Sequence, residues 1–270
     1  MEELLQQLTR QVQGKYYGKF RGFVVDNEDP EKRARLKLRV PSVLGSEVSG
    51  WALPCLPFGG LAGHGWFAVP EVDAQVWVEF EEGELRSPIW TGTFWQAEGD
   101  PPQDAALTPP TTRLLQTPSG HMLQFDDKQD EERFRLVHPK GSEVVVDPNG
   151  SVSLTDAKGA RVLLDSENDK LVIEDSHGNT LTLGSSGITV EDSSGNKIEM
   201  ATSGVTVKGQ QIVVEGSQVM LGGQGGEPVI KGQSFLTLFA THMHTTAVGP
   251  TSPPIPQGEM STLSMAVLTK

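Results

Sequence analysis

Residues 141–156 read GSEVVVDPNGSVSLTD, and related segments follow: GARVLLDSENDKLVIED at 159–175, GNTLTLGSSGITVED at 178–192 and GNKIEMATSGVTVKG at 195–209. Each segment holds two short runs in which aliphatic and polar residues alternate. Alternation with a period of two is typical of β-strands, and the Gly, Asn, Asp and Ser residues between the runs favour turns. The sequence therefore predicts a β-repeat of roughly nine residues, one strand and one turn long.

Each predicted strand points two aliphatic side chains to one face and Thr, Ser, Glu, Lys or Asp to the other, because successive side chains alternate across a strand. Two inward side chains per strand make a thin core, which one chain folded in such short rungs cannot enclose. The predicted inward pairs are Val144/Val146, Val152/Leu154, Val162/Leu164, Leu171/Ile173, Leu181/Leu183, Ile188/Val190, Ile198/Met200, Val205/Val207, Ile212/Val214 and Val219/Leu221.

Three copies of the chain would complete the thin core of this repeat. If each copy forms one side of a triangular prism, the inward side chains meet on the three-fold axis and backbone groups pair between chains. No Phe, Trp or Tyr occurs from Leu136 to Ser234, as expected where three equivalent side chains share one narrow layer. The sequence thus predicts an intertwined trimeric β-helix, or needle, and the alternative is a monomeric two-sided solenoid.

The region before the repeat predicts a different β-structure. All five Trp residues lie within 51–95, and the stretch KFRGFVVDNEDPEKRARLKLRVP at 19–41 predicts two strands around an acidic turn. Further strands are predicted at 75–80 and 88–92, on either side of an acidic turn at 81–84. About five short strands with inward aromatic residues indicate a small closed barrel of the OB-fold type. The predicted fold class is therefore all-β.

The sequence also predicts how the chain is divided. Leu4, Leu5 and Leu8 recur at helical spacing and predict a short amphipathic helix. Closely spaced prolines between the barrel and the repeat predict a semi-stiff linker. The predicted parts are an N-terminal helical arm at 1–15, an OB-fold domain at 16–97, a Pro-rich linker at 98–113, a β-helix shaft at 114–234 and a C-terminal tip region at 235–270.

The charge of the chain limits its partners. The chain has 22 Lys and Arg residues against 35 Asp and Glu residues, a formal net charge of −13. Nucleic acids and anionic membranes attract cationic surfaces, so this balance disfavours nucleic-acid binding by the OB-fold domain. The single cysteine, Cys55, excludes an intrachain disulfide. We find no signal-peptide pattern or transmembrane run and expect synthesis in the cytoplasm.

Several motifs together resemble one family. Gly22-Phe-Val-Val-Asp-Asn27, Trp51-Ala-Leu-Pro54 and Val76-Trp-Val-Glu-Phe80 resemble the OB domain of phage baseplate assembly protein V. Thr117-Pro-Ser-Gly-His-Met-Leu-Gln-Phe-Asp-Asp127 resembles the passage from OB domain to β-helix in the same family. This family comprises the central spike proteins of contractile injection systems, including the valine-glycine repeat protein of type VI secretion. The order of the motifs is more specific than any one of them.

The resemblance implies a structural, homotrimeric spike that pierces a target envelope from the baseplate of a phage tail or tail-like particle. The OB domains would form a collar at the tail tube, bound to hub and inner tube proteins. A tip protein of the proline-alanine-alanine-arginine repeat (PAAR) type is a further implied partner, and the target envelope is contacted only transiently. The assembled protein would reside in a virion or an extracellular particle. The chain has no inserted lysozyme domain, so we expect no enzymatic activity.

The segment Thr241-His-Met-His-Thr245 is a candidate metal site. In a strand, residues i and i+2 share a face, so His242 and His244 of three chains could direct six imidazole nitrogens to one divalent ion on the axis. The resemblance implies iron, because family spikes with a His-x-His pair near the tip hold iron in this way. The simpler reading is a pair of polar residues in a solvated loop.

Other functions have less support in the sequence. The main alternative is a β-helical polysaccharide-degrading enzyme or adhesin of the tailspike kind, whose sites usually present aromatic residues and clustered carboxylates along a groove. The predicted shaft has no aromatic residues in its repeats. Neither G-x-S-x-G nor H-E-x-x-H occurs, and we predict no catalytic residues.

Overall fold

The structure is a computed structural model that describes residues 2, 6, 14–105, 108–219, 230 and 232–255. The chain divides into two compact units, residues 1–207 and 208–270. Apart from residues 2 and 6, the helix predicted at 1–15 lies outside the described residues.

The first part of unit one is a small barrel. Its sheet has the strand order β2-β1-β4-β5-β3. Leu36 and Ala52 exchange backbone hydrogen bonds of 3.1 and 2.7 Å, which join the β2 side of the sheet to the β3 side and close the barrel. The elements are β1 (Phe20–Asp26), β2 (Lys37–Arg39), α2 (Pro41–Leu44), β3 (Leu53–Pro54), β4 (Gln75–Phe80), the 3-10 helix η1 (Glu81–Gly83) and β5 (Pro88–Thr93).

Alternation in the sequence places the barrel core, but the core is mostly aliphatic rather than aromatic, and Trp90 is the one Trp residue in it. Leu36, Leu38 and Val40 have no exposed surface, while the cationic residues between them have side chains on the outer face. The Trp90 indole N–H donates to the Ala34 carbonyl at 3.0 Å, so the largest core side chain has its polar atom satisfied. The core residues are Val24, Leu36, Leu38, Val40, Ala52, Val76, Val78, Phe80 and Trp90.

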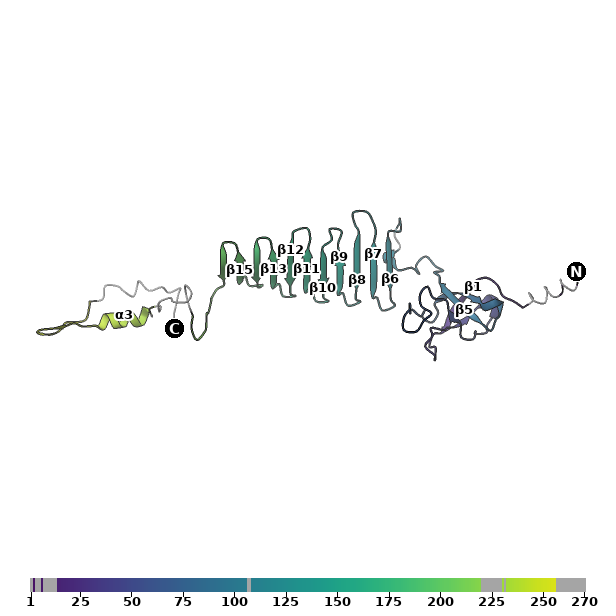
Figure 1. Cartoon of the computed structure of the whole chain (residues 1–270), viewed down its shortest axis with the longest axis horizontal. Coiled ribbons are helices and arrows are strands. Elements are labelled where there is room, and N and C mark those ends of the chain that lie inside the picture. The colour runs from purple at the N-terminus through teal and green to yellow at the C-terminus, as the bar shows by residue number, and fades with distance from the viewer. Residues whose placement is uncertain are drawn as a thin grey trace. The chain divides into compact units, whose positions relative to one another are not determined.

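A single antiparallel sheet follows, in which every strand pairs with the next strand of the same chain. Figure 1 shows these strands side by side in one layer. The 3-10 helix η2 (Gln103–Ala105) precedes the sheet. The strands are β6 (Thr112–Gln116), β7 (Met122–Asp126), β8 (Arg133–Val137), β9 (Glu143–Val146), β10 (Val152–Thr155), β11 (Arg161–Asp165), β12 (Lys170–Glu174), β13 (Thr180–Gly184), β14 (Gly187–Glu191), β15 (Lys197–Ala201) and β16 (Gly204–Lys208).

The turns of this sheet follow a local rule. At Asp156, Asp175 and Asp192, one carboxylate oxygen accepts the backbone N–H groups two and four residues later, at 2.8–2.9 Å. The residue three positions after each Asp is a glycine with φ between 81° and 92°. This conformation costs glycine little and other residues more. The D-x-x-G pattern therefore fixes a tight connection and the register of the strands that it joins.

Unit two contains a helix that the sequence analysis missed. Helix α3 (Gly232–Thr241) includes Phe235 and Phe239, and a short hairpin of β17 (Thr245–Thr246) and β18 (Gly249–Pro250) follows it. The predicted strand pair Ile212/Val214 is wrong, because residues 209–219 form no strand. Leu221 lies outside the described residues.

The all-β class, with an OB barrel followed by a long β-repeat, is confirmed. The backbone pairing differs from the expected pairing between chains, because consecutive strands of one chain satisfy each other's hydrogen-bonding groups. The turns explain the difference: they are short enough to reverse the chain directly into the neighbouring strand.

Candidate functional site

One face of the long sheet carries two columns of apolar side chains, which we call the apolar ladder. Residues directly opposite each other in an antiparallel pair have neighbouring side chains on the same face. The first column is Leu115, Leu123, Leu136, Val144, Leu154, Val162, Ile173, Leu181, Val190 and Ile198. The second is Phe125, Phe134, Val146, Val152, Leu164, Leu171, Leu183, Ile188 and Met200.

Solvent reaches the apolar ladder along its whole length in the single chain. Leu136, Leu154 and Leu164 are 50%, 53% and 52% exposed, and no member of either column is buried. Complete burial stabilises a side chain of this size by about 1.5–3 kcal/mol. A continuous apolar surface of this extent marks a site of interaction in a folded protein. The apolar ladder is therefore the candidate functional site.

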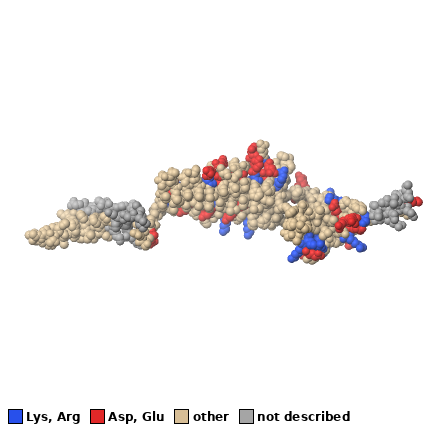
Figure 2. Space-filling model, in the orientation of Figure 1, with Lys and Arg blue, Asp and Glu red and all other residues tan. Residues whose placement is uncertain are grey.

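The opposite face of the sheet is mixed and carries most of its charges. Near the start of the sheet, Arg133 pairs with Asp126 at 3.0 Å and Arg135 pairs with Glu143 at 3.1 Å. On the face that Figure 2 shows, charged side chains gather along the margins of the sheet. The middle column of the opposite face is Leu114, Gln124, Arg135, Val145, Ser153, Leu163, Val172, Thr182, Thr189 and Glu199. From β7 to β15, the paired residues of the ladder columns are all apolar, whereas in β6 Arg113 lies opposite Phe125 on the ladder face.

The turns of the long sheet favour the ionised form of their Asp side chains. The Asn179 side-chain amide and the backbone N–H groups of Asn179 and His177 donate to Asp175 and lower its pKa to about 2. In the same way, the amide of Asn196 lowers the pKa of Asp192, and the backbone N–H of Lys158 lowers that of Asp156. Hydrogen bonds to the ionised form are the cause in each turn.

Four cationic residues of the OB barrel, namely Lys19, Arg33, Arg35 and Lys37, pair with acidic residues within it. Arg35 pairs with Asp29 at 2.6 Å and lowers the pKa of that carboxyl well below its usual range, and the Asp29 side chain is only 3% exposed. Lys37 pairs with Asp26 at 2.9 Å. These cations are directed to carboxylates rather than displayed as a surface for phosphates.

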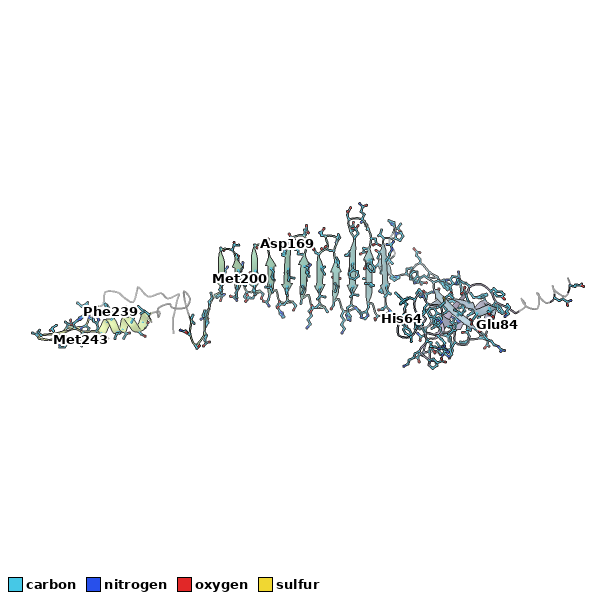
Figure 3. The ribbon with its side chains drawn as sticks, viewed as in Figure 1. His64, Glu84, Asp169, Met200, Phe239 and Met243 are labelled. Atoms are coloured by element: carbon cyan, nitrogen blue, oxygen red, sulfur yellow. The ribbon has the colours of Figure 1, made fainter. Side chains whose placement is uncertain are left out.

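Gly187, at the start of β14, has a specific structural role. Its φ is 133°, and a Cβ atom there would lie 1.9 Å from the Met200 carbonyl oxygen. No larger residue fits at this position without displacing the neighbouring strand. Figure 3 shows Met200 on the adjacent strand β15. The close approach keeps the ladder columns in register where the turn between β13 and β14 is short.

The structure brings His242 and His244 together, with ring centroids 5.1 Å apart. They lie between α3 and β17 rather than in a strand, so the expected strand geometry is wrong. The His242 Nδ1 atom contacts the Phe239 carbonyl, which can only accept a hydrogen bond. In the neutral ring that donates through Nδ1, the nitrogen left to bind a ligand would be Nε2.

The described residues of one chain supply too few ligands for a metal at this pair. Among the described residues, no group of three or more His, Cys, Asp or Glu side chains could hold an ion. Transition metals in proteins take about four to six ligands. The donor chemistry of the pair suits such a metal, but its other ligands would have to come from outside the described residues of one chain.

His121 and His138 lie at turns of the long sheet, where their contacts indicate a structural role. They come from different turns, yet their ring centroids are 4.9 Å apart. His138 Nδ1 accepts the Lys140 N–H at 3.1 Å, as Asp does at the equivalent point of other turns. The ring thus replaces a carboxylate as the turn cap.

The sequence analysis missed the first part of the apolar ladder. Its list of inward pairs begins at Val144, but the register places Leu115, Leu123 and Leu136 in the same column. The signal was present in the alternation of MLQFD at 122–126 and RFRLV at 133–137. It was less visible because the turns there do not repeat the later pattern.

Comparisons with known proteins bear on the barrel. The family model of the type VI secretion system/phage-baseplate injector OB domain matches residues 20–95. These residues run from β1 to just beyond β5, which is the whole closed barrel. A comparison with curated proteins finds no match to the chain. Among the described residues, no helix is long and apolar enough to cross a membrane. Residues 20–95 are therefore similar to the injector OB domain of the type VI secretion and phage-baseplate family, which confirms the resemblance to baseplate spike proteins.

Proposed function

We propose that the protein is the trimeric central spike of a contractile phage tail or tail-like injection particle, and that its shaft is driven through a target envelope. The injector OB domain supports a role in the baseplate or spike. The apolar ladder is the observation that carries the finer proposal, because a face with two apolar columns needs a partner surface of the same length.

Three ladders facing a common axis satisfy that need. Each layer would then hold six apolar side chains, two from each copy, and the mixed faces would point to solvent. In this proposal, the backbone hydrogen bonds within each sheet resist bending, and the apolar axis resists separation of the copies. A contracting sheath supplies the force, so the spike needs no catalytic group. The injector OB domain gives no support to a polysaccharide-degrading enzyme or adhesin.

The proposal extends to the partners of the spike. The OB domains would bind hub or inner tube proteins of the baseplate. A PAAR-type protein would cap the far end of the shaft. These contacts would place the protein in a virion or a released particle after its synthesis in the cytoplasm.

The mass of the protein in solution tests the trimer directly. We expect a species of about three times 29.2 kDa by light scattering on a sizing column. A species of 29.2 kDa at micromolar concentration contradicts the proposal, because the apolar ladder would then be stable in water without a partner.

We also propose that His242 and His244 of three copies hold one iron or another divalent transition metal on the axis. The approach of the two imidazole rings to 5.1 Å supports this assignment, and the contact of His242 Nδ1 with the Phe239 carbonyl is the kind of outer hydrogen bond that orients metal-binding histidines. The protein should contain about one iron per three chains after anaerobic purification, measured by elemental analysis. The His242→Ala/His244→Ala variant should lose the metal and stay trimeric. Unchanged metal content in this variant contradicts the assignment.

A further inference from the structure

The OB barrel has a loop of unusual composition between β3 and β4. Residues 53–70 read LPCLPFGGLAGHGWFAVP and contain no Asp, Glu, Lys or Arg, in a chain where charged residues make up 21%. The Trp66 N–H donates to the Phe58 carbonyl at 3.0 Å and closes the loop on itself. Figure 3 labels His64, which lies in this closed part. The loop is therefore a formed structure with a defined tip.

The tip of the loop exposes large apolar side chains. Phe58, Leu61 and Phe67 are 62%, 75% and 70% exposed. The Phe58 ring lies 5.7 Å from the His64 ring, which supports it from one side only. Side chains of this size expose on the order of 100 Å² each at such fractions. We call Phe58, Leu61 and Phe67 the loop tip.

A groove of matching character lies on the same domain. Its volume is about 1030 Å³, and its walls include Cys55, Leu56, Trp66 and Val69 from the base of the loop, Trp90, Phe94 and Trp95 from the barrel, and Gln116 and Pro118 from the start of the long sheet. Trp95 is 65% exposed, so the loop tip of the same chain does not fill the groove. We call this feature the OB groove. One domain thus carries both an apolar projection and an apolar recess, and among the described residues neither is covered.

We infer that the loop tip of each copy inserts into the OB groove of the next copy. Two different complementary surfaces on one chain form a head-to-tail contact, and such contacts close into a ring when the rotation permits. A three-fold ring provides one groove for each tip. The inference rests on the proposed trimer and adds a second contact between copies, formed by the OB domains independently of the apolar ladder.

The choice of a second copy follows from the composition of both surfaces. A charge-free tip has no group with which to recognise a strongly charged partner. The groove supplies aromatic walls of the kind that anchor buried interface residues. Insertion would cover the tip and the groove together, which removes both exposed apolar surfaces of the domain at once. A membrane surface would cover only the tip.

A disulfide trap tests the contact, because Cys55 in the groove is the only cysteine of the chain. In the Leu61→Cys variant, oxidation with diamide should link the introduced thiol of one copy to Cys55 of the next and reduce the diamide. Denaturing gels without reductant should show covalent dimers and trimers in more than half of the protein. The same substitution in a Cys55→Ser background should give only single chains.

Further controls distinguish this inference from the proposal that the protein is a trimer. Ser46→Cys places a thiol on another exposed loop of the barrel and should cross-link at least tenfold less. If Leu61→Cys gives only single chains on the gel while light scattering finds a trimer, the inference is overturned and the trimer stands. If light scattering finds a monomer, the proposed function fails first. Equal cross-linking at positions 46 and 61 also overturns the inference.

The reactivity of Cys55 provides a second measurement on the unlinked protein. In the single chain its side chain is exposed. Insertion of the neighbouring tip would cover it, so a thiol reagent should label wild-type Cys55 at least tenfold more slowly than in the Leu61→Asp variant. That variant brings a carboxylate toward a groove that already contains Glu71 and Asp100. Equal labelling rates, or binding of the wild-type protein to neutral lipid vesicles that Leu61→Asp abolishes, overturn the inference.

Discussion

At the scale of single residues, the tight turns of the long sheet depend on side chains that accept hydrogen bonds from backbone N–H groups. Asp175 accepts two backbone N–H groups that would otherwise be unpaired in the tight turn, at 2.8 and 2.9 Å. Its oxygen fixes the direction in which the chain leaves β12 and enters β13. A small number of such residues, repeated along the sheet, therefore sets the register of the whole apolar face.

The lowered pKa of Asp175 predicts a pH dependence of stability. Because hydrogen bonds from Asn179 and His177 lower its pKa from 3.8 to about 2 in the folded chain, its stabilising effect is complete above about pH 4. The effect is lost as the pH falls through about 2. Asp175→Ala should lower the unfolding temperature at pH 7, and its difference from wild type should shrink between pH 4 and pH 2.

Thermal unfolding followed by circular dichroism across this pH range measures the effect. Glu174→Ala is the matched control, because Glu174 is the neighbouring acidic residue at the exposed end of β12. Its difference from wild type should not follow the same titration. A destabilisation by Asp175→Ala that is constant from pH 7 to pH 2 contradicts the assigned role.

At the scale of elements, the apolar ladder is a property of the pairing between strands. Leu183 in β13 lies opposite Leu171 in β12 and Ile188 in β14, so the second column continues across all three strands. Thr182, one residue earlier, lies opposite Val172 and Thr189 on the other face. Adjacent residues of one strand thus belong to two different environments.

This contrast predicts opposite outcomes for one substitution at neighbouring positions. Leu183→Glu puts a charge into the proposed axis, where three copies would bury it without a partner, and should convert the trimer into single chains or prevent its assembly. Thr182→Glu keeps the charge on the solvent side and should leave the trimer intact. Light scattering measures both. Equal behaviour of the two variants means that the ladder face is not the interface.

At the scale of the whole molecule, the net charge and the exposed apolar surfaces favour protein partners over nucleic acid. The net charge of −13 per chain repels polyanions, and the pairing of Asp26 with Lys37 and of Asp29 with Arg35 reduces the cationic surface further. Apolar surfaces remain on the long sheet and on the OB loop. We therefore expect protein partners rather than nucleic acid, although OB folds elsewhere bind nucleic acid.

The same charge balance predicts weak binding to nucleic acid. A labelled single-stranded or duplex DNA should show no mobility shift below about 10 μM protein in low salt, because few phosphates can be neutralised. Asp26→Asn removes the partner of Lys37 and should increase binding in the same assay. A wild-type dissociation constant below about 1 μM contradicts the assignment of the OB domain to protein contacts.

Local chemistry makes much of the fold predictable. Alternation identifies the barrel strands and the buried side of residues 34–40, and alternation punctuated by Gly, Asn, Asp and Ser turns identifies strands from β9 to β16. The sequence analysis does not predict helix α3. It interprets Phe235, Leu236, Leu238 and Phe239, the first large side chains after the repeat, as compatible with a trimeric shaft that becomes wider at this point. The strand predicted at Ile212 and Val214 is absent from the structure, because alternation along the chain does not by itself provide a neighbouring strand to pair with.

The sequence by itself determined the all-β class, the order of barrel and repeat, and the two-sided character of each strand, because these depend on near neighbours along the chain. Only the tertiary structure decided that consecutive strands of one chain pair with each other, that Leu115 and Phe125 join the same columns as the later repeats, and that His242 approaches His244 outside a strand. Hydrogen-bond register and side-chain approach join residues that are distant in sequence, so local patterns constrain them only in part.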